Sequence, residues 1–181
     1  VGAVTINRGL ENVLFSLKEI SDINFVTLGP KNNKVIERLK NIRKELKLED
    51  RVFFLDPVPP DQLLNFIQSA DASILPINNV CLSYYYCMPN KLFESVFAGL
   101  PVLVSNMKDM KSFVEKYNCG KVFDINSAGG LSKDIKNFFD NIDNYILTKE
   151  LRKGLKIRYS WEAQEVSILN IYKNILRTTK N

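Results

Sequence analysis

Apolar residues follow two alternating patterns along the chain. Short, continuous apolar runs are punctuated by Gly, Pro or Asn and are followed by longer segments in which apolar positions recur every three or four residues. The first pattern is typical of a strand buried on both faces, and the second of an amphipathic helix. The runs predict strands at 1–4, 24–28, 52–55, 72–75, 101–105 and 121–123. The periodic segments predict helices at 10–20, 32–46, 61–69, 90–98, 108–117 and from 131 to the end, with a long last helix after Trp161.

Strands of four or five residues that alternate with longer helices indicate βαβ units. We therefore expect an α/β fold, a Rossmann-like doubly wound parallel sheet of about six strands with helices on both faces. A length of 181 residues fits a single domain over 1–181. Ligands of such folds bind at the carboxyl ends of the strands, which here means the loops 5–9, 29–33, 56–60 and 77–91.

Composition removes several classes of function. The chain has no His, which excludes the Ser-His-Asp and Cys-His arrangements and the commonest zinc ligand. Cys81, Cys87 and Cys119 lack the spacing of a metal or redox pair, so we expect reduced, partly buried thiols in a cytoplasmic protein. No apolar run has the length of a membrane span, and a net charge of +5 is too small and scattered to indicate nucleic acid.

Arg8 is the first candidate for ligand chemistry. It stands in the loop 5–9, at the start of the first predicted helix, and an Arg side chain binds phosphate bidentately. The loop does not match the GxGxxG dinucleotide motif. The alternative is a surface Arg beside the turn residue Gly9.

The segment 88–104 is the most specific part of the sequence. Pro89 and Asn90 begin a helix abruptly, which leaves the N–H groups near Asn90, Lys91 and Leu92 unpaired and suited to an anion. Lys91 and Glu94 share one helical face, so the cation can hold a phosphate while the carboxylate accepts from two ribose hydroxyls. The alternative is an ordinary ion pair on the helix surface.

Residues 89–94, which read PNKLFE, and 98–102, which read AGLPV, resemble the nucleotide-sugar motif of group 1 glycosyltransferases, a large retaining family with the GT-B fold. Segments 2–9, 52–59, 70–76 and 160–172 are similar to other parts of that family in the same order. The resemblance covers nearly the whole chain but only the C-terminal half of a GT-B enzyme. It implies a donor-binding domain, with the N-terminal acceptor domain missing from this chain and Val1 inside a central strand.

The resemblance also assigns roles to residues. Glu94 would bind the ribose, the loop at Val58 would lie along the base, and Arg8 with the N–H groups near Asn90 and Lys91 would hold the diphosphate. Arg8 and Lys91 would act catalytically by neutralising the departing diphosphate. The nucleotide-sugar-binding set is Gly2, Arg8, Val58, Tyr86, Asn90, Lys91, Leu92 and Glu94. No metal or other cofactor is implied.

Two positions depart from the family pattern. Tyr86 stands where the family often has a second Glu, eight residues before Glu94, and Ala3 replaces the Arg of a usual Gly-Arg pair. We expect Arg8 and Lys91 to suffice for the phosphates. Tyr84, Tyr85 and Tyr86 would supply hydroxyls and stacking faces for a sugar.

The function implied is retaining transfer from a nucleoside-diphosphate sugar to a saccharide or lipid-linked acceptor in bacterial surface polysaccharide synthesis. The isolated domain would be inactive without its own N-terminal domain. We expect a cytoplasmic protein with peripheral contact at the inner membrane face and no nucleic-acid partner.

Two other functions and one additional surface remain open from the sequence. A GT-B sugar-nucleotide 2-epimerase would need acid and base residues, and the lack of His counts against it. A non-catalytic regulatory module of the receiver type would need an acidic cluster, which Asp56 and Asp71 do not form. The additional surface is basic and suits a membrane or a nucleic acid, formed by Lys149, Arg152, Lys153, Lys156 and Arg158. We assign Phe53, Phe54, Phe93 and Trp161 to the core.

Overall fold

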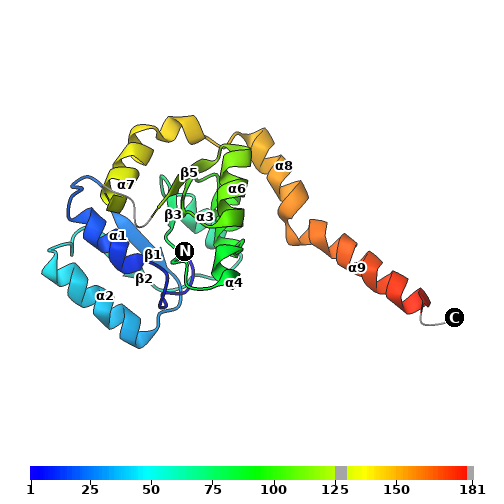
Figure 1. The fold of residues 1–181 in the computed structure, drawn as a ribbon, viewed down its shortest axis with the longest axis horizontal. Helices are drawn as coiled ribbons and strands as arrows, with labels where there is room; N and C mark the ends of the chain where they lie inside the picture. Colours follow the sequence, from blue (N-terminus) through cyan, green and yellow to red (C-terminus); the bar gives the residue numbers. More distant parts are fainter. Residues whose placement is uncertain (125–129, 179–181) are drawn as a thin grey trace. The chain divides into compact units, whose positions relative to one another are not determined.

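Strands and helices alternate from Leu10 to Phe123, except that two helices, Leu82–Tyr85 and Asn90–Ala98, stand in succession before the fourth strand (Figure 1). The computed structural model describes residues 1–124 and 130–178, so the predicted helical end at 179–181 lies outside the described residues. The strands are β1 (Phe25–Leu28), β2 (Val52–Leu55), β3 (Ser73–Leu75), β4 (Val102–Ser105) and β5 (Gly120–Phe123). The helices are α1 (Leu10–Leu17), α2 (Asn33–Glu45), α3 (Leu63–Ile67), α4 (Leu82–Tyr85), α5 (Asn90–Ala98), α6 (Lys108–Tyr117), α7 (Gly130–Asp140), the 3₁₀ turn η1 (Ile142–Tyr145), α8 (Lys149–Tyr159) and α9 (Trp161–Thr178).

All strand pairs in the described residues are parallel. β1 pairs with β2, with Phe25 opposite Val52, and the second sheet has the order β3-β4-β5. The α/β class and the parallel pairing are therefore confirmed.

The expected count of six strands is wrong for the described residues, because segment 1–4 forms only an isolated bridge between Val4 and Lys31. The pairing is interrupted at Pro30, which has no N–H to donate. Gly2, with φ +100°, also leaves the extended conformation.

Helices cover both faces of the strands. On one face, α1, α2 and α7 pack apolar side chains over the sheet in one cluster that includes Leu14, Leu39 and Phe138. On the other face, Leu28 of β1 packs against Ile67 of α3 and Ala98 of α5. The strands are thus enclosed between two apolar layers, as the continuous apolar runs predict.

Several element boundaries agree with the sequence pattern, and others differ. β2, α5 and α6 begin and end where predicted. α3 is shorter than the predicted 61–69, since Gln62 and Leu63 donate to Pro59 and Pro60 in turns before the helix.

Two of the four predicted core aromatics are exposed. Phe53 is 40% exposed because its strand, β2, is an edge strand in the described sheet, and Trp161 is 68% exposed. Phe54 packs against the first cluster, and Phe93 meets Phe113 edge to face with ring centroids 5.5 Å apart. Assignment to the core is therefore wrong for Phe53 and Trp161.

The chain divides into two compact units, Val1–Ile146 and Leu147–Asn181. The first contains all the described strands. The second contains α8, whose N-terminus is capped by the Thr148 hydroxyl accepting from the Leu151 N–H at 3.2 Å, and α9. None of the described helices is both long enough and apolar enough to span a membrane.

Candidate functional site

The N-terminus of α5 leaves backbone donors open. Pro89 precedes the helix in an extended conformation, and no side chain caps the first turn. Among the described residues, the N–H groups of Asn90 and Lys91 have no acceptor. The prediction of a third free donor at Leu92 is wrong, because its N–H donates to the Pro89 carbonyl at 2.9 Å and its side chain is fully buried. Two donors therefore remain for an anion.

The loop 5–9 is held against the end of β3. A Cβ on Gly9, whose φ is +62°, would lie 2.0 Å from the carbonyl oxygen of Pro76, so the two backbones touch there. The Asn78 N–H also donates to the Asn7 carbonyl at 3.1 Å. These contacts fix Arg8 between the first loop and the loop 77–91. Its guanidinium carbon lies 5.2 Å from the centre of the Tyr84 ring, a cation–π contact.

Lys91 and Arg8 form a concentration of positive charge. Burial, followed by the charge of Arg8, lowers the pKa of Lys91 to about 8. Two neighbouring cations in a partly buried place repel each other, and a bound anion would relieve this repulsion. The alternative of an ordinary surface ion pair fails, since Lys91 and Glu94 do not approach within 4 Å in the described structure and Lys91 is only partly exposed.

Glu94 lies one turn further along α5 and is half-buried. Burial raises the pKa of its carboxyl group, and the positive charges of the Val1 amino group and Lys91 oppose this rise. The charge effects indicate that Glu94 lies near Lys91 and the Val1 amino group. A carboxylate in this position can accept hydrogen bonds from neighbouring hydroxyls of a bound molecule.

Gly2 and Val58 lie at the same edge of the strands. The Gly2 N–H donates to the Leu28 carbonyl at 2.9 Å. A Cβ on Gly29 would stand 2.5 Å from the Gly2 oxygen, so these two loops are in close contact. Val58 follows β2 and packs against the apolar cluster around Leu28.

Tyr86 ends α4 and is exposed. The Lys108 ammonium nitrogen lies 4.9 Å from the centre of the Tyr86 ring, and the Tyr85 ring meets the Tyr86 ring edge to face. Within the described residues, no ring contact, hydrogen bond or ion pair joins Tyr86 to Arg8, Lys91 or Glu94. The structure therefore brings together Arg8, Lys91 and Glu94, and leaves Tyr86 at the C-terminal end of α4, in contact with Lys108 and Tyr85.

Three residues of the predicted ligand loops, Cys87, Lys31 and Asp56, were not predicted as parts of the site. Cys87 lies within electrostatic reach of both Arg8 and Lys91, and burial raises the pKa of its thiol. Lys31 and Asp56 form an ion pair with 2.6 Å between nitrogen and oxygen. All three stand in the loops 29–33, 56–60 and 77–91, where the sequence predicts ligand binding. Their residue types gave no further signal, because neither a Cys nor a surface ion pair suggests phosphate chemistry.

Asp56 and Asp71 lie at opposite ends of parallel strands. Asp56 follows β2, whereas Asp71 precedes β3. Because the carboxyl ends of parallel strands share one edge, the two carboxylates cannot form one acidic cluster. The arrangement does not fit a receiver-type phosphoacceptor site.

Two solved structures illustrate the fold that this chain shares with known proteins. The first is sucrose-phosphate synthase from Thermosynechococcus elongatus, with a TM-score of 0.81 and 18% identity over 98% of this chain and 45% of that chain. The second is Anabaena HepE in complex with UDP-glucose, with a TM-score of 0.71 and 14% identity over 99% of this chain and 48% of that chain. These structures match the C-terminal half of the GT-B fold.

Curated relatives carry one description. A D-inositol 3-phosphate glycosyltransferase of Corynebacterium urealyticum is 22% identical in an alignment that covers 84% of this chain and 35% of that relative. A D-inositol 3-phosphate glycosyltransferase of Acidothermus cellulolyticus is 25% identical, and the alignment covers 82% of this chain and 32% of that relative. The chain thus spans about a third of the length of these relatives. The family model described as glycosyl transferases group 1 matches residues 1–154. The chain therefore belongs to the group 1 glycosyltransferases.

Proposed function

We propose that this chain is the donor-binding half of a glycosyltransferase and holds a nucleoside-diphosphate sugar at the N-terminus of α5. The observation that carries the proposal is the convergence of Arg8, Lys91 and two open backbone donors, with Glu94 one turn further on. Two cations and a helix N-terminus suit a diphosphate, and a carboxylate at that separation suits a ribose. HepE has been solved with UDP and with UDP-glucose, which makes UDP the first ligand to test.

In this proposal, transfer proceeds with retention of configuration at the anomeric carbon. The bond between that carbon and the diphosphate oxygen breaks, and the electron pair leaves with the nucleoside diphosphate. An acceptor hydroxyl oxygen bonds to the same face of the carbon, and its proton passes to the leaving diphosphate oxygen. Arg8, Lys91 and the dipole of α5 neutralise the charge that develops on the leaving oxygen. This electrostatic role is the reason for naming Arg8 and Lys91 as catalytic residues.

The acceptor belongs to the other half of the enzyme in this proposal. We expect a saccharide or lipid-linked acceptor, bound by an N-terminal domain, in bacterial surface polysaccharide synthesis. The curated relatives are described as D-inositol 3-phosphate glycosyltransferases, so an inositol phosphate is a second acceptor class to test. The 181-residue chain alone is expected to bind donor and to transfer nothing.

We also propose that donor binding needs no metal ion. In residues 1–124 and 130–178, no three His, Cys, Asp or Glu side chains gather into a group that could hold a metal ion without a substrate. The cations of Arg8 and Lys91 would take the place of a metal beside the diphosphate. Equal affinity for UDP with EDTA and with Mg²⁺ is expected, and a strong Mg²⁺ requirement would contradict this part of the proposal.

Peripheral membrane contact is a separate proposal that concerns α8. This helix carries Lys149, Arg152, Lys153, Lys156 and Arg158. Basic residues of this kind bind anionic lipid surfaces through a salt-sensitive attraction. Cosedimentation with anionic liposomes at low salt, lost at high salt, is the expected result, and failure to bind at either salt concentration would remove the proposal.

The donor site is tested by isothermal titration calorimetry with UDP, GDP and ADP. Glu94→Ala should weaken binding of the preferred nucleotide roughly 10- to 100-fold, because it removes a charge-assisted hydrogen bond to the ribose. Glu115→Ala is the matched control, since Glu115 is exposed on α6. The absence of binding to all three nucleotides, or unchanged binding by Glu94→Ala, would defeat the proposal.

A 2′-deoxynucleotide separates a ribose contact from a general effect of the substitution. The wild-type chain should bind the deoxy analogue more weakly than the ribonucleotide. In Glu94→Ala this difference should vanish, because the carboxylate that senses the hydroxyl is gone. If the ribonucleotide and the deoxynucleotide differed in affinity by the same factor in both proteins, Glu94 would not contact the ribose 2′-hydroxyl.

A further inference from the structure

Arg8 has no acidic partner in the part of the chain that the structure describes. No ion pair within residues 1–124 and 130–178 includes its guanidinium, and the guanidinium donates no hydrogen bond there. The group that meets it is the Tyr84 ring, whose centre lies 5.2 Å from the guanidinium carbon. A long, partly exposed and charged side chain is thus held by an aromatic ring instead of a carboxylate.

This choice of partner matters for a site that binds an anion. A carboxylate would occupy two N–H groups of the guanidinium and cancel its charge. The π face of a ring attracts the cation but carries no net charge, so the positive charge remains available to a bound anion. The guanidinium has five N–H donors in a fixed planar arrangement, and these also remain available.

Backbone hydrogen bonds fix the position of Tyr84 on α4. The Tyr84 and Tyr85 N–H groups both donate to the Cys81 carbonyl at 3.0 Å. The Cys87 N–H donates to the Tyr84 carbonyl at 3.2 Å. The turns before and after Tyr84 are therefore both closed by hydrogen bonds, and the ring projects from a defined backbone.

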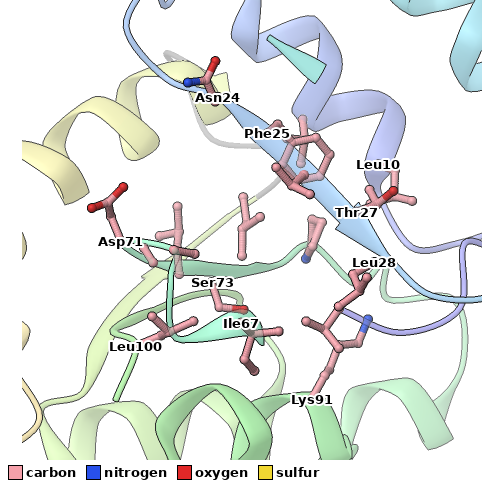
Figure 2. A pocket seen from close by; sticks show the side chains of 18 of the residues that line it. Leu10, Asn24, Phe25, Thr27, Leu28, Ile67, Asp71, Ser73, Lys91 and Leu100 are labelled. Atoms are coloured by element: carbon pink, nitrogen blue, oxygen red, sulfur yellow. The ribbon is translucent and has the colours of Figure 1, made fainter. Parts of the chain in front are cut away.

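The guanidinium lies near the other cation of the candidate site. Arg8 and Lys91 line the same cavity, together with residues of β1 and β3, and Figure 2 shows the Lys91 side chain at its edge. Burial, followed by the charge of Arg8, lowers the pKa of Lys91 to about 8. Cys87 and Glu94 also act on Lys91 and oppose this fall, and the Val1 amino group is a further positive charge that interacts with it. Titration of Lys91 therefore reports on the position of Arg8.

We propose that Tyr84 is a positioning residue: its ring holds the Arg8 guanidinium near Lys91 and leaves the guanidinium charge and donors open to an anion. Because two cations repel each other, the Arg8 side chain would turn away from Lys91 without the ring. One face of the Tyr84 ring then serves Arg8 and is not open to a sugar. The role in diphosphate binding rests on the proposed function, whereas the effect of the ring on Arg8 is measurable without a nucleotide.

The first test titrates Lys91 in the chain without a nucleotide. NMR of protein labelled with ¹³C-lysine follows the Lys91 side chain, whose signal is identified by its absence in Lys91→Arg. In Tyr84→Leu the pKa of Lys91 should rise from about 8 toward its ordinary value of 10.5, because the neighbouring cation moves away. Arg8→Gln should shift it in the same direction. Tyr84→Phe keeps the ring and should keep the wild-type pKa.

Two controls make the titration specific. Tyr85→Leu changes the neighbouring tyrosine of α4, whose ring meets Tyr86, and should leave the pKa of Lys91 unchanged. In the Arg8→Gln background, Tyr84→Leu should add nothing, because the ring acts on Lys91 only through Arg8. An unchanged pKa in Tyr84→Leu, an equal rise in Tyr85→Leu, or an undiminished effect of Tyr84→Leu in the Arg8→Gln background would overturn the proposal.

A second measurement uses the wild-type chain and does not depend on whether Tyr84→Leu folds. Nuclear Overhauser effects should join the δ protons of Arg8 to the ring protons of Tyr84, because the cation–π contact brings these groups together. Their absence in the wild-type chain would contradict the proposal.

Nucleotide titration then measures the consequence for ligand binding. Tyr84→Leu should weaken binding of UDP about 3- to 10-fold, and Tyr84→Phe should restore it. Wild-type affinity in Tyr84→Leu would show that the ring does not position Arg8 for a diphosphate. If the wild-type chain bound no nucleotide, the proposed function would fail, while the titration of Lys91 would still decide whether the Tyr84 ring holds Arg8.

Discussion

Lys91 should take up a proton when a diphosphate binds. Its pKa is lowered to about 8 in the free chain by burial and by Arg8, and a bound anion opposes both effects. Above pH 8 the free side chain is neutral, while the bound side chain stays charged. We therefore predict that affinity for the diphosphate falls as pH rises from 7 to 9.5, most steeply near pH 8. Calorimetry at pH 8.5 in two buffers of different ionisation enthalpy measures the proton taken up.

Lys91→Arg is the control for this pH dependence. Arg remains charged over the whole range, so the variant should bind with nearly constant affinity. Lys111→Arg on α6 should keep the wild-type profile, because Lys111 is exposed and distant in sequence from the site. A flat profile in the wild-type chain, or the same step in Lys91→Arg, would show that another group titrates.

Thr27 presents a polar atom that the fold does not satisfy. Its hydroxyl oxygen is buried in β1 without a partner among the described residues. Thr27→Val keeps the shape and removes the hydroxyl, so the free energy of unfolding should rise by about 1 kcal/mol. Thr148→Val removes the N-terminal cap of α8, so the free energy of unfolding should fall by about 1 kcal/mol. Urea denaturation measures both, and a loss of stability in Thr27→Val would show that its hydroxyl has a partner.

At the scale of elements, the contact between the loop 5–9 and β3 depends on Gly9. Gly9→Ala would drive a Cβ into the Pro76 carbonyl at a positive φ, so the free energy of unfolding should fall by about 2 kcal/mol or more. Because the loop carries Arg8, nucleotide affinity should fall as well. Gly154→Ala is the matched control, since a Cβ there meets nothing within 4 Å.

Gly154 lies inside α8, so its replacement by Ala should raise stability by about 0.5–1 kcal/mol. Thermal unfolding and nucleotide titration of the two variants provide the comparison. If Gly9→Ala were as stable as the wild-type chain and bound nucleotide equally well, the contact with Pro76 would not position the loop.

Local chemistry made some elements predictable. α5 starts at Asn90 because Pro89 precedes it, and it ends at Gly99, which adopts φ +93°. The first strand was not predictable in the same way, because its pairing depends on Pro30, a residue distant in sequence that cannot donate. Exposure of Phe53 likewise depends on which strand forms the edge of the sheet.

The candidate site was predictable in outline for a similar reason. Parallel strands bring their carboxyl ends to one edge, which places Arg8 near Lys91 from the sequence alone. The lowered pKa of Lys91 and the ring of Tyr84 under Arg8 depend on the packing of loops. The occupied N–H of Leu92 depends on the tight first turn of α5, which sequence spacing does not reveal.

At the scale of the whole molecule, the chain spans about a third of the curated relatives it matches. Its described residues hold the features proposed for donor binding. Under the proposed function, glycosyl transfer requires both this chain and an acceptor-binding domain.

The N-terminus of α5 is proposed to hold the diphosphate. An NMR titration of the ¹⁵N-labelled chain with UDP, GDP and ADP tests this proposal, because it reports on each backbone N–H. The amides of Asn90 and Lys91 are expected to shift most, together with those around Arg8, and Lys91→Ala is expected to weaken these shifts. Shifts concentrated on other elements, such as α8, or no shifts with any of the three nucleotides, would contradict it.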